Sequence, residues 1–215
     1  MSDKSHLSDI RREYGKLTLS KELAASDPLV QFEAWFEDIL KTENPDPTAM
    51  LLSTIDEQGH PDSRVVLLKG ISSEGFVFYT NYNSNKARQI EDNPWVCANF
   101  FWPRLIRQVK LRGKLERISA EHSDAYFHSR PFLSQVGAIA SPQSEVVVDR
   151  AALESRMNAL IEKYGQEPIM RPEHWGGYCL TVTEYEFWQG RDNRLHDRLR
   201  YTRSDDAWLI ERLAP

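Results

Sequence analysis

Three basic residues near the C-terminus, Arg194, His196 and Arg198, occupy alternate positions in the chain. In an extended strand, alternate side chains point to the same face, so the spacing predicts that all three line one surface. Two guanidinium groups beside an imidazole offer planar, donor-rich contacts that suit a flat anionic ligand. A solvated sheet edge is the alternative. The preceding Trp188 and the central histidine weaken that alternative, although the spacing alone leaves both interpretations open.

A second pair of cations, Arg64 and Lys69, flanks a short aliphatic run made of Val65, Val66, Leu67 and Leu68. Five positions apart, the two cations fall on opposite faces of a regular strand, so we expect them to serve different groups unless a bulge intervenes. Such a strand can lie against a flat ring while its flanking cations bind phosphates. From the residues alone, a buried strand with solvent-exposed ends is favoured.

Two further groups of residues have the chemistry of phosphate sites. Tyr79 and Thr80 end a predicted strand, and Lys86 lies near the start of a predicted helix, where free N–H groups and a cation favour an anion. Gln143 and Ser144 lie in a polar loop.

Tyr126, Arg130 and Ser134 are spaced by four, but Pro131 disfavours helical geometry at Arg130. We therefore predict one helix that ends just before Arg130 and a second that has Pro131 in its first turn. The first N–H groups of the second helix, these three side chains and Lys69 would then converge on one phosphate. A helix corner with polar surface residues is the alternative.

The elements that position these residues are mostly short strands. Apolar periodicity predicts a helix that begins at Pro28 and ends near Asn44-Pro45, and further helices over 85–92, 121–129 and 149–164. It predicts strands over 48–56, 63–71, 75–81, 94–102, 106–119, 176–188, 196–202 and 208–213. Strands joined by short turns, with few long helices between them, indicate a closed barrel rather than a parallel sheet. The polar residues 1–26 predict a mobile arm before a single domain over 27–215.

Composition limits the classes of function. The chain has 215 residues with 27 basic and 32 acidic side chains, and its net charge of −5 argues against a nucleic-acid partner. Neither a signal segment nor a membrane span is indicated, and Cys97 and Cys179 lie in apolar runs, so a soluble cytoplasmic protein with reduced thiols is expected. A disulfide stays open without distances. The spacings typical of a metal site, a dinucleotide fold or a serine nucleophile elbow are missing.

An ordered set of segments resembles the pyridoxine/pyridoxamine 5′-phosphate oxidases, FMN enzymes that make pyridoxal 5′-phosphate. The segments are Arg64–Lys69, Phe78–Asn81, Arg107–Val109, Tyr126–Pro131, Ser134–Gln135, Gln143–Ser144, Trp175–Gly177, Glu186–Arg198 and Arg212–Pro215. Together with the matching Arg11 and Tyr14, the resemblance covers roughly residues 11 to 215. Each segment is weak alone, whereas the set in family order is specific.

The resemblance implies a mainly β fold with flanking helices, the FMN-binding split β-barrel, and a homodimer with FMN at the subunit interface. The implied FMN contacts are Arg64, Val65, Val66, Leu67, Leu68, Lys69, Tyr79, Thr80, Lys86, Gln108, Gln143, Ser144, Trp188 and Arg198. The implied substrate contacts are Lys69, Tyr126, Arg130 and Ser134 at the phosphate, the catalytic pair Arg194 and His196 at the pyridine ring, and Arg11 and Tyr14 in an arm that can fold over the site. The family often has two adjacent basic residues where this chain has Asn85-Lys86, so one cation is missing.

The implied reaction is oxidation of pyridoxine or pyridoxamine 5′-phosphate to pyridoxal 5′-phosphate. A hydride leaves C4′ for FMN, dioxygen is reduced to hydrogen peroxide, and the amine substrate also releases ammonia. A non-catalytic split-barrel protein that binds a flavin or pyridoxal phosphate is one alternative, and a reductase with a different flavin-like cofactor is another. The substrate set and the Arg-x-His-x-Arg pattern argue against both.

Overall fold

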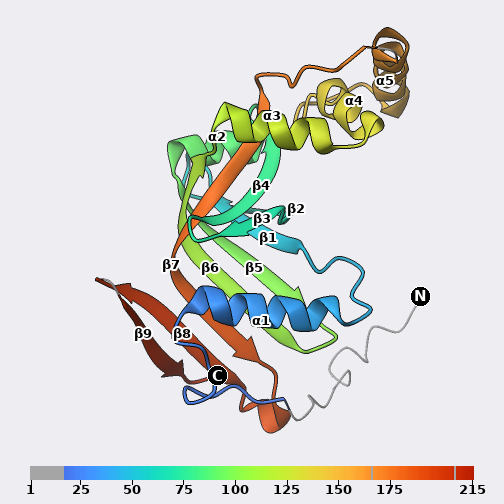
Figure 1. Ribbon diagram of the computed structural model, residues 1–215. Helices are drawn as coiled ribbons and strands as arrows, with labels where there is room; N and C mark the ends of the chain where they lie inside the picture. The colour runs from blue at the N-terminus through green and yellow to red at the C-terminus, as the bar shows by residue number, and fades with distance from the viewer. Residues whose placement is uncertain (1–16, 166, 206) are drawn as a thin grey trace, which may run out of the picture. The chain divides into compact units, whose positions relative to one another are not determined.

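The computed structural model describes residues 17–165, 167–205 and 207–215 (Figure 1). Its helices are α1 (Pro28–Leu40), α2 (Asn85–Asp92), α3 (Ala120–Ser129), α4 (Phe132–Ala140) and α5 (Arg150–Tyr164). Its strands are β1 (Ala49–Ile55), β2 (Pro61–Leu67), β3 (Gly70–Ser72), β4 (Gly75–Asn81), β5 (Trp95–Trp102), β6 (Arg107–Arg117), β7 (Trp175–Gln189), β8 (Asp197–Ser204) and β9 (Ala207–Leu213). Arg11 and Tyr14 lie outside the described residues, so their predicted role stays a prediction.

In these residues the strands form one nine-stranded sheet with the order β2-β1-β5-β6-β7-β4-β3, and β8 and β9 continue it from β7. The pairs β1–β2, β3–β4, β4–β7, β7–β8 and β8–β9 are all antiparallel. This confirms a mainly β protein with flanking helices. No helix in the described ranges is long and apolar enough to cross a membrane.

The chain divides into two compact units. Of the described residues, unit 1 contains 17–47, 99–111, 183–205 and 207–215, and unit 2 contains 48–98, 112–165 and 167–182. Strands β5, β6 and β7 each contribute residues to both units. The two units are described separately below.

Unit 1 is organised by α1, which begins as its sequence predicts. Asp27 caps the helix by accepting a hydrogen bond from the Leu29 N–H at 2.8 Å, and Pro28 occupies the first turn. The buried face of α1 packs its aromatic residues against the sheet, with Trp35 edge-on to Phe187 at 5.3 Å between ring centroids. In Figure 1, β8 and β9 form the adjoining hairpin.

Residues 17–26 also belong to unit 1 and contain neither helix nor strand. Leu19 is buried, and its N–H donates to the Asp197 carboxylate at 3.1 Å. The carbonyl of Ala25 accepts from the Tyr201 hydroxyl at 2.9 Å. This segment is therefore tied to β8, while the mobility predicted for the arm as a whole stays a prediction.

In unit 2 the strand predicted over 63–71 is wrong, because two strands occupy this range. β2 ends at Leu67 and β3 begins at Gly70. Between them, the Leu68 N–H donates to the Thr48 carbonyl at 2.9 Å and the Lys69 N–H to the Val77 carbonyl at 2.7 Å. The chain thus leaves β1 and joins β4 at this point, so the opposite-face argument for Arg64 and Lys69 does not apply.

The corner between α3 and α4 forms as predicted. Helix α3 ends at Ser129, Arg130 is extended (φ −75°, ψ 148°), and Pro131 is the N-cap of α4 rather than part of its first turn. Beneath the corner lies a buried core made of Phe127, Val136, Ile169 and Trp175. Helix α4 packs beside α5 (Figure 1).

Candidate active site

Unit 2 contains a cavity of about 470 Å³. It is lined by Val65, Val66 and Leu67 of β2, by Lys69, by Tyr79, Thr80 and Asn81 of β4, by Lys86 of α2, by Tyr126, Arg130, Ser134, Gly137 and Ala138 of the α3–α4 corner, and by Ser141, Gln143 and Trp175. The structure therefore brings together in one cavity the four side chains that were predicted to bind one phosphate, Lys69, Tyr126, Arg130 and Ser134. It brings most of the predicted FMN contacts of β2, β4 and α2 to the same cavity.

Arg130 provides a cation to the cavity, and not all of its N–H donors have hydrogen-bond acceptors. Its guanidinium lies 4.6 Å from the centre of the Trp175 ring, and its Nη1 is buried with no hydrogen-bond partner in the structure. Burial lowers the pKa of Arg130, and the nearby Tyr126 opposes this effect. An unpaired buried N–H costs about 1–3 kcal/mol, so an anion that accepts from Nη1 would remove an existing penalty.

Beside Arg130, three aromatic rings form a wall of the cavity. The Tyr126 ring stacks on Tyr79 with centroids 3.8 Å apart, and Trp175 stacks on Tyr79 at 5.5 Å. Burial raises the pKa of both tyrosines, although Arg130 partly offsets the effect at Tyr126. Tyr126 therefore keeps its hydroxyl proton at neutral pH and can donate it to an anion.

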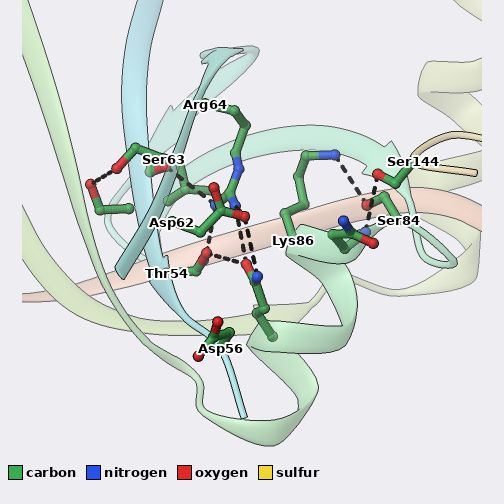
Figure 2. Close-up of polar contacts among 12 residues, drawn as sticks. Thr54, Asp56, Asp62, Ser63, Arg64, Ser84, Lys86 and Ser144 are labelled. Carbon is green, nitrogen blue, oxygen red and sulfur yellow. Dashed lines mark hydrogen bonds and ion pairs between the residues drawn. The ribbon is translucent and has the colours of Figure 1, made fainter. Parts of the chain in front are cut away.

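Lys86 lies at the start of α2 in a cluster of oxygen atoms. Its ammonium donates to Gln143 Oε1 at 2.9 Å and to Thr80 Oγ1 at 3.2 Å. It also donates to Ser84 Oγ at 3.0 Å (Figure 2). Burial first, and then the charge of Arg64, lower the pKa of Lys86 to about 8, with Asp62 opposing. The buried cation and these neighbours have the donor set of a phosphate site.

The position of the missing cation is occupied by Asn85, which is engaged locally. Its N–H donates to Ser144 Oγ at 3.2 Å, and its side-chain carbonyl accepts from the guanidinium of Arg88 one turn later. Arg88 also donates to the Asn83 carbonyl at 2.6 Å. A guanidinium thus lies beside the start of α2, although it comes from position 88.

Three predicted FMN contacts of unit 2, Arg64, Leu68 and Ser144, do not line the cavity. The Arg64 guanidinium donates to Asp62 at 2.5 Å, to Thr54 at 2.6 Å and to Gln89 at 3.0 Å (Figure 2). Its donors are directed at protein oxygens, and its role toward a cofactor stays a prediction.

In unit 1, the extended arrangement predicted for Arg194, His196 and Arg198 is wrong. Residues 192–194 form a short 3-10 helix in which Asn193 (φ 54°) and Arg194 (φ 59°) are left-handed, and β8 begins only at Asp197. The Leu195 N–H donates to the Asp192 carbonyl at 3.2 Å and closes the turn. A shared strand face therefore does not relate the three side chains.

His196 is placed by its neighbours on both sides of the turn. Its Nδ1 accepts a hydrogen bond from the Arg191 backbone N–H at 3.1 Å, and its ring centroid lies 4.7 Å from that of Trp188. Burial and the charge of Arg194 lower the pKa of His196. The imidazole is consequently neutral at physiological pH.

Arg198 is held by a carboxylate that the sequence analysis missed. Its Nε and Nη2 donate to Glu186 Oε1 at 2.9 and 2.7 Å, and its Nη1 donates to the Ala214 carbonyl at 2.7 Å. Burial raises the pKa of Glu186, but hydrogen bonds from Lys110 and Arg198 outweigh this effect and lower it overall. In the sequence, Glu186 is a charged residue within the apolar run 185–188, and this could have indicated a buried ion pair. Gln108 lies on β6 in this unit and is half-buried.

Comparisons with known proteins match nearly the whole chain. A family model described as pyridoxamine 5′-phosphate oxidase matches residues 36–164, and one described as the pyridoxine 5′-phosphate oxidase C-terminal dimerisation region matches residues 175–215. A relative from Legionella pneumophila, named pyridoxine/pyridoxamine 5′-phosphate oxidase, is 58% identical over 215 residues. The match covers 100% of this chain and 100% of the relative. The chain belongs to the pyridoxine/pyridoxamine 5′-phosphate oxidase family of enzymes.

Other members of this oxidase family and its structural neighbours agree with the assignment. A relative of the same name from Salinibacter ruber is 51% identical over 98% of this chain and 100% of its own. The crystal structure of PhzG from Burkholderia lata, in complex with tetrahydrophenazine-1-carboxylic acid, has a TM-score of 0.88 and 27% identity, covering 95% of this chain and 100% of its own. A crystal structure from Nostoc punctiforme, described as a pyridoxamine 5′-phosphate oxidase-related, FMN binding protein, shares the fold with a TM-score of 0.71. It is 19% identical and covers 89% of this chain and 100% of its own. The predicted split-barrel fold is confirmed.

Proposed function

We propose that this protein oxidises pyridoxine or pyridoxamine 5′-phosphate to pyridoxal 5′-phosphate, with FMN as cofactor and dioxygen as electron acceptor. The alcohol and dioxygen give the aldehyde and hydrogen peroxide. The amine, dioxygen and water give the aldehyde, ammonia and hydrogen peroxide. Support comes from family membership at 58% identity and from the phosphate-binding chemistry of the cavity.

The strongest support for a phosphorylated substrate is Nη1 of Arg130, which is buried and has no hydrogen-bond partner. Lys69, Tyr126 and Ser134 line the same cavity, and together the four side chains supply two cations and two hydroxyl groups. A phosphate dianion offers oxygen acceptors for all of them. In this proposal they bind the substrate phosphate and fix the position of the pyridine ring.

The residues present also fit FMN. The buried Lys86, with Thr80 and the N–H groups at the start of α2, would hold the FMN phosphate. Val65 and Leu67, which are exposed and line the cavity, would contact the isoalloxazine ring. When bound, FMN supplies the hydride acceptor, whereas the protein binds and orients the substrate.

We assign Arg194 and His196 to the substrate ring, and Gln108, Trp188 and Arg198 to the flavin. All five belong to unit 1, whereas the cavity belongs to unit 2. The C-terminal match to a dimerisation region supports a homodimer, and we propose that FMN binds at the subunit interface.

Subunit complementation tests this interface. Arg130→Ala and Arg194→Ala each disable one set of contacts. If the sets meet across a subunit interface, an equal mixture of the two variants, unfolded and refolded together, should recover about a quarter of wild-type activity, because half of the dimers carry one intact site. At a substrate concentration well below KM, each variant refolded alone should keep only its own low activity. No recovery in proven mixed dimers would show that both sets come from one chain.

A non-catalytic carrier of flavin or pyridoxal phosphate is the alternative, and the absorbance spectrum and substrate response separate it from the oxidase. The purified protein should show a flavin spectrum that pyridoxamine 5′-phosphate bleaches without oxygen. A flavin spectrum that the substrate leaves unchanged would favour the carrier.

A further inference from the structure

The loop between β7 and β8 is tied at both ends. At its start, the Gly190 N–H donates to the Ile106 carbonyl at 2.8 Å, and a Cβ at this glycine would come within 2.2 Å of the Ile106 side chain. At its end, Asp197 accepts from the Arg191 guanidinium at 3.0 Å and from Arg212 at 2.7 Å. The conformation between these points is thereby fixed.

The fixed conformation includes two consecutive left-handed residues that are not glycine, Asn193 and Arg194. Such residues cost about 1–3 kcal/mol each in sparsely populated backbone regions, and they persist where the surrounding contacts determine the conformation. One product of this loop geometry is the 3.1 Å contact between the Arg191 backbone N–H and His196 Nδ1.

A backbone amide nitrogen can only donate, so Nδ1 of His196 must be the acceptor in this contact. A neutral imidazole carries a single proton, and its two nitrogens divide the roles of donor and acceptor. We infer that the Arg191 backbone holds His196 as the tautomer protonated on Nε2, so that His196 acts on the substrate as a hydrogen-bond donor rather than as a proton-accepting base. The inference rests on the proposed function for the contact between His196 and substrate.

The surroundings of the ring support this arrangement. A proton on Nδ1 would face the Arg191 N–H and replace an attractive contact with a repulsive one. Partial burial, and then the charge of Arg194, lower the pKa of His196, which favours the neutral ring. Nε2–H can then donate to an oxygen of the anionic substrate, while the lone pair that a general base needs is already used by Arg191.

Two substitutions at position 196 distinguish the nitrogens. The glutamine side-chain amide places its N–H₂ near the site of Nε2, whereas the shorter asparagine amide reaches only the site of Nδ1. We expect His196→Gln to keep kcat/KM for pyridoxamine 5′-phosphate within about tenfold of wild type. We expect His196→Asn to lose a further ten- to hundredfold, the cost of one hydrogen bond to a charged group. Both are measured at saturating FMN.

Matched controls come from His60, an exposed histidine on the β1–β2 turn beside Asp56. His60→Gln and His60→Asn should both leave kcat/KM unchanged. Equal or greater activity of His196→Asn relative to His196→Gln would overturn the inference. Wild-type activity in both His196 variants would remove His196 from the substrate and overturn the donor role as well.

Nitrogen NMR of the histidine-labelled holoenzyme tests the tautomer independently of activity, with the His196 signals assigned by their loss in His196→Gln. Nδ1 should be unprotonated and Nε2 protonated near neutral pH. A proton on Nδ1 would overturn the inference even if the oxidase function holds. The expected tautomer in a protein without oxidase activity would instead show that the proposed function has failed.

Discussion

Replacing Arg130 with alanine should weaken substrate binding while leaving the fold and FMN in place. The truncation removes a guanidinium stacked 4.6 Å from Trp175, an interaction worth about 0.5–2 kcal/mol to the fold. It also removes the buried Nη1, which has no hydrogen-bond partner and costs about 1–3 kcal/mol. The two effects oppose each other, so we expect the free energy of unfolding to change by only about 1 kcal/mol.

Substrate binding has no such compensation. Losing one charge-assisted hydrogen bond to a phosphate costs about 1.5–3 kcal/mol, which corresponds to a loss of affinity of roughly ten- to over a hundredfold. Arg130→Lys keeps the charge but loses the planar fork, so its loss should be smaller. Arg150→Ala on α5 is the matched control, because Arg150 is exposed and pairs only with its helix neighbour Glu154 in the described structure.

The assay measures three quantities for each variant. These are the dissociation constant of pyridoxal 5′-phosphate, the dissociation constant of FMN and the midpoint of thermal unfolding. We expect Arg130→Ala to raise the dissociation constant of pyridoxal 5′-phosphate strongly and to change the other two quantities little. A variant that loses FMN but binds pyridoxal 5′-phosphate normally would show that Arg130 serves the other phosphate, and a strongly destabilised variant would show that Nη1 has a structural partner.

Other predictions concern the remaining cations. FMN affinity should fall as pH rises above about 8, because the ammonium form of Lys86 binds the phosphate and deprotonates there, and titration of FMN into Lys86→Arg between about pH 7 and pH 9 should lack this slope. Asn85→Arg should tighten FMN binding about two- to fivefold by adding a cation at the helix start, whereas unchanged affinity would place the phosphate elsewhere. Arg198→Ala should lower flavin occupancy, and Glu186→Gln should do so less, as measured by absorbance; equal occupancy to wild type in both would remove Arg198 from the flavin. Arg194→Lys should retain FMN and lose peroxide formation, and full activity there would defeat the assignment of Arg194 to the substrate.

Local signals in the sequence predicted the elements around the cavity well. The bounds of α2 and β4 match the predicted 85–92 and 75–81, because Ser84 and the glycine turn at 75 mark their starts. The geometry of the α3–α4 corner followed from Pro131, whose ring excludes helical backbone at Arg130. The convergence of side chains from this corner on one cavity with Lys69 was predicted mainly from the family resemblance, which assigns these four side chains to one phosphate.

Long-range pairing was harder to predict. The aliphatic run 65–68 is continuous in sequence, so nothing local marks the point where the chain leaves β1 for β4. That exchange of partners depends on Thr48 and Val77, which lie far from Leu68 and Lys69 in opposite directions along the chain. The continuous aliphatic run therefore predicted one strand where the sheet contains two.

The alternation at residues 194–198 misled for a different reason. It is equally compatible with a strand and with a turn followed by a strand, and Asp192-Asn193 favours a turn. That turn extends through Arg194, whose left-handed backbone has no sequence signal because arginine rarely adopts it. The ion pair between Glu186 and Arg198 was likewise missed, because their pairing depends on the register of β7 against β8.

The central claim is tested most directly by product analysis of the purified protein. The yellow protein is heated to release its cofactor, which is identified by chromatography, and the intact protein is incubated with pyridoxamine 5′-phosphate in air. We expect the released cofactor to be FMN, and we expect pyridoxal 5′-phosphate and hydrogen peroxide to form in equal amounts. Release of FAD, or saturable binding of pyridoxamine 5′-phosphate by the FMN-loaded protein without formation of either product, would contradict it.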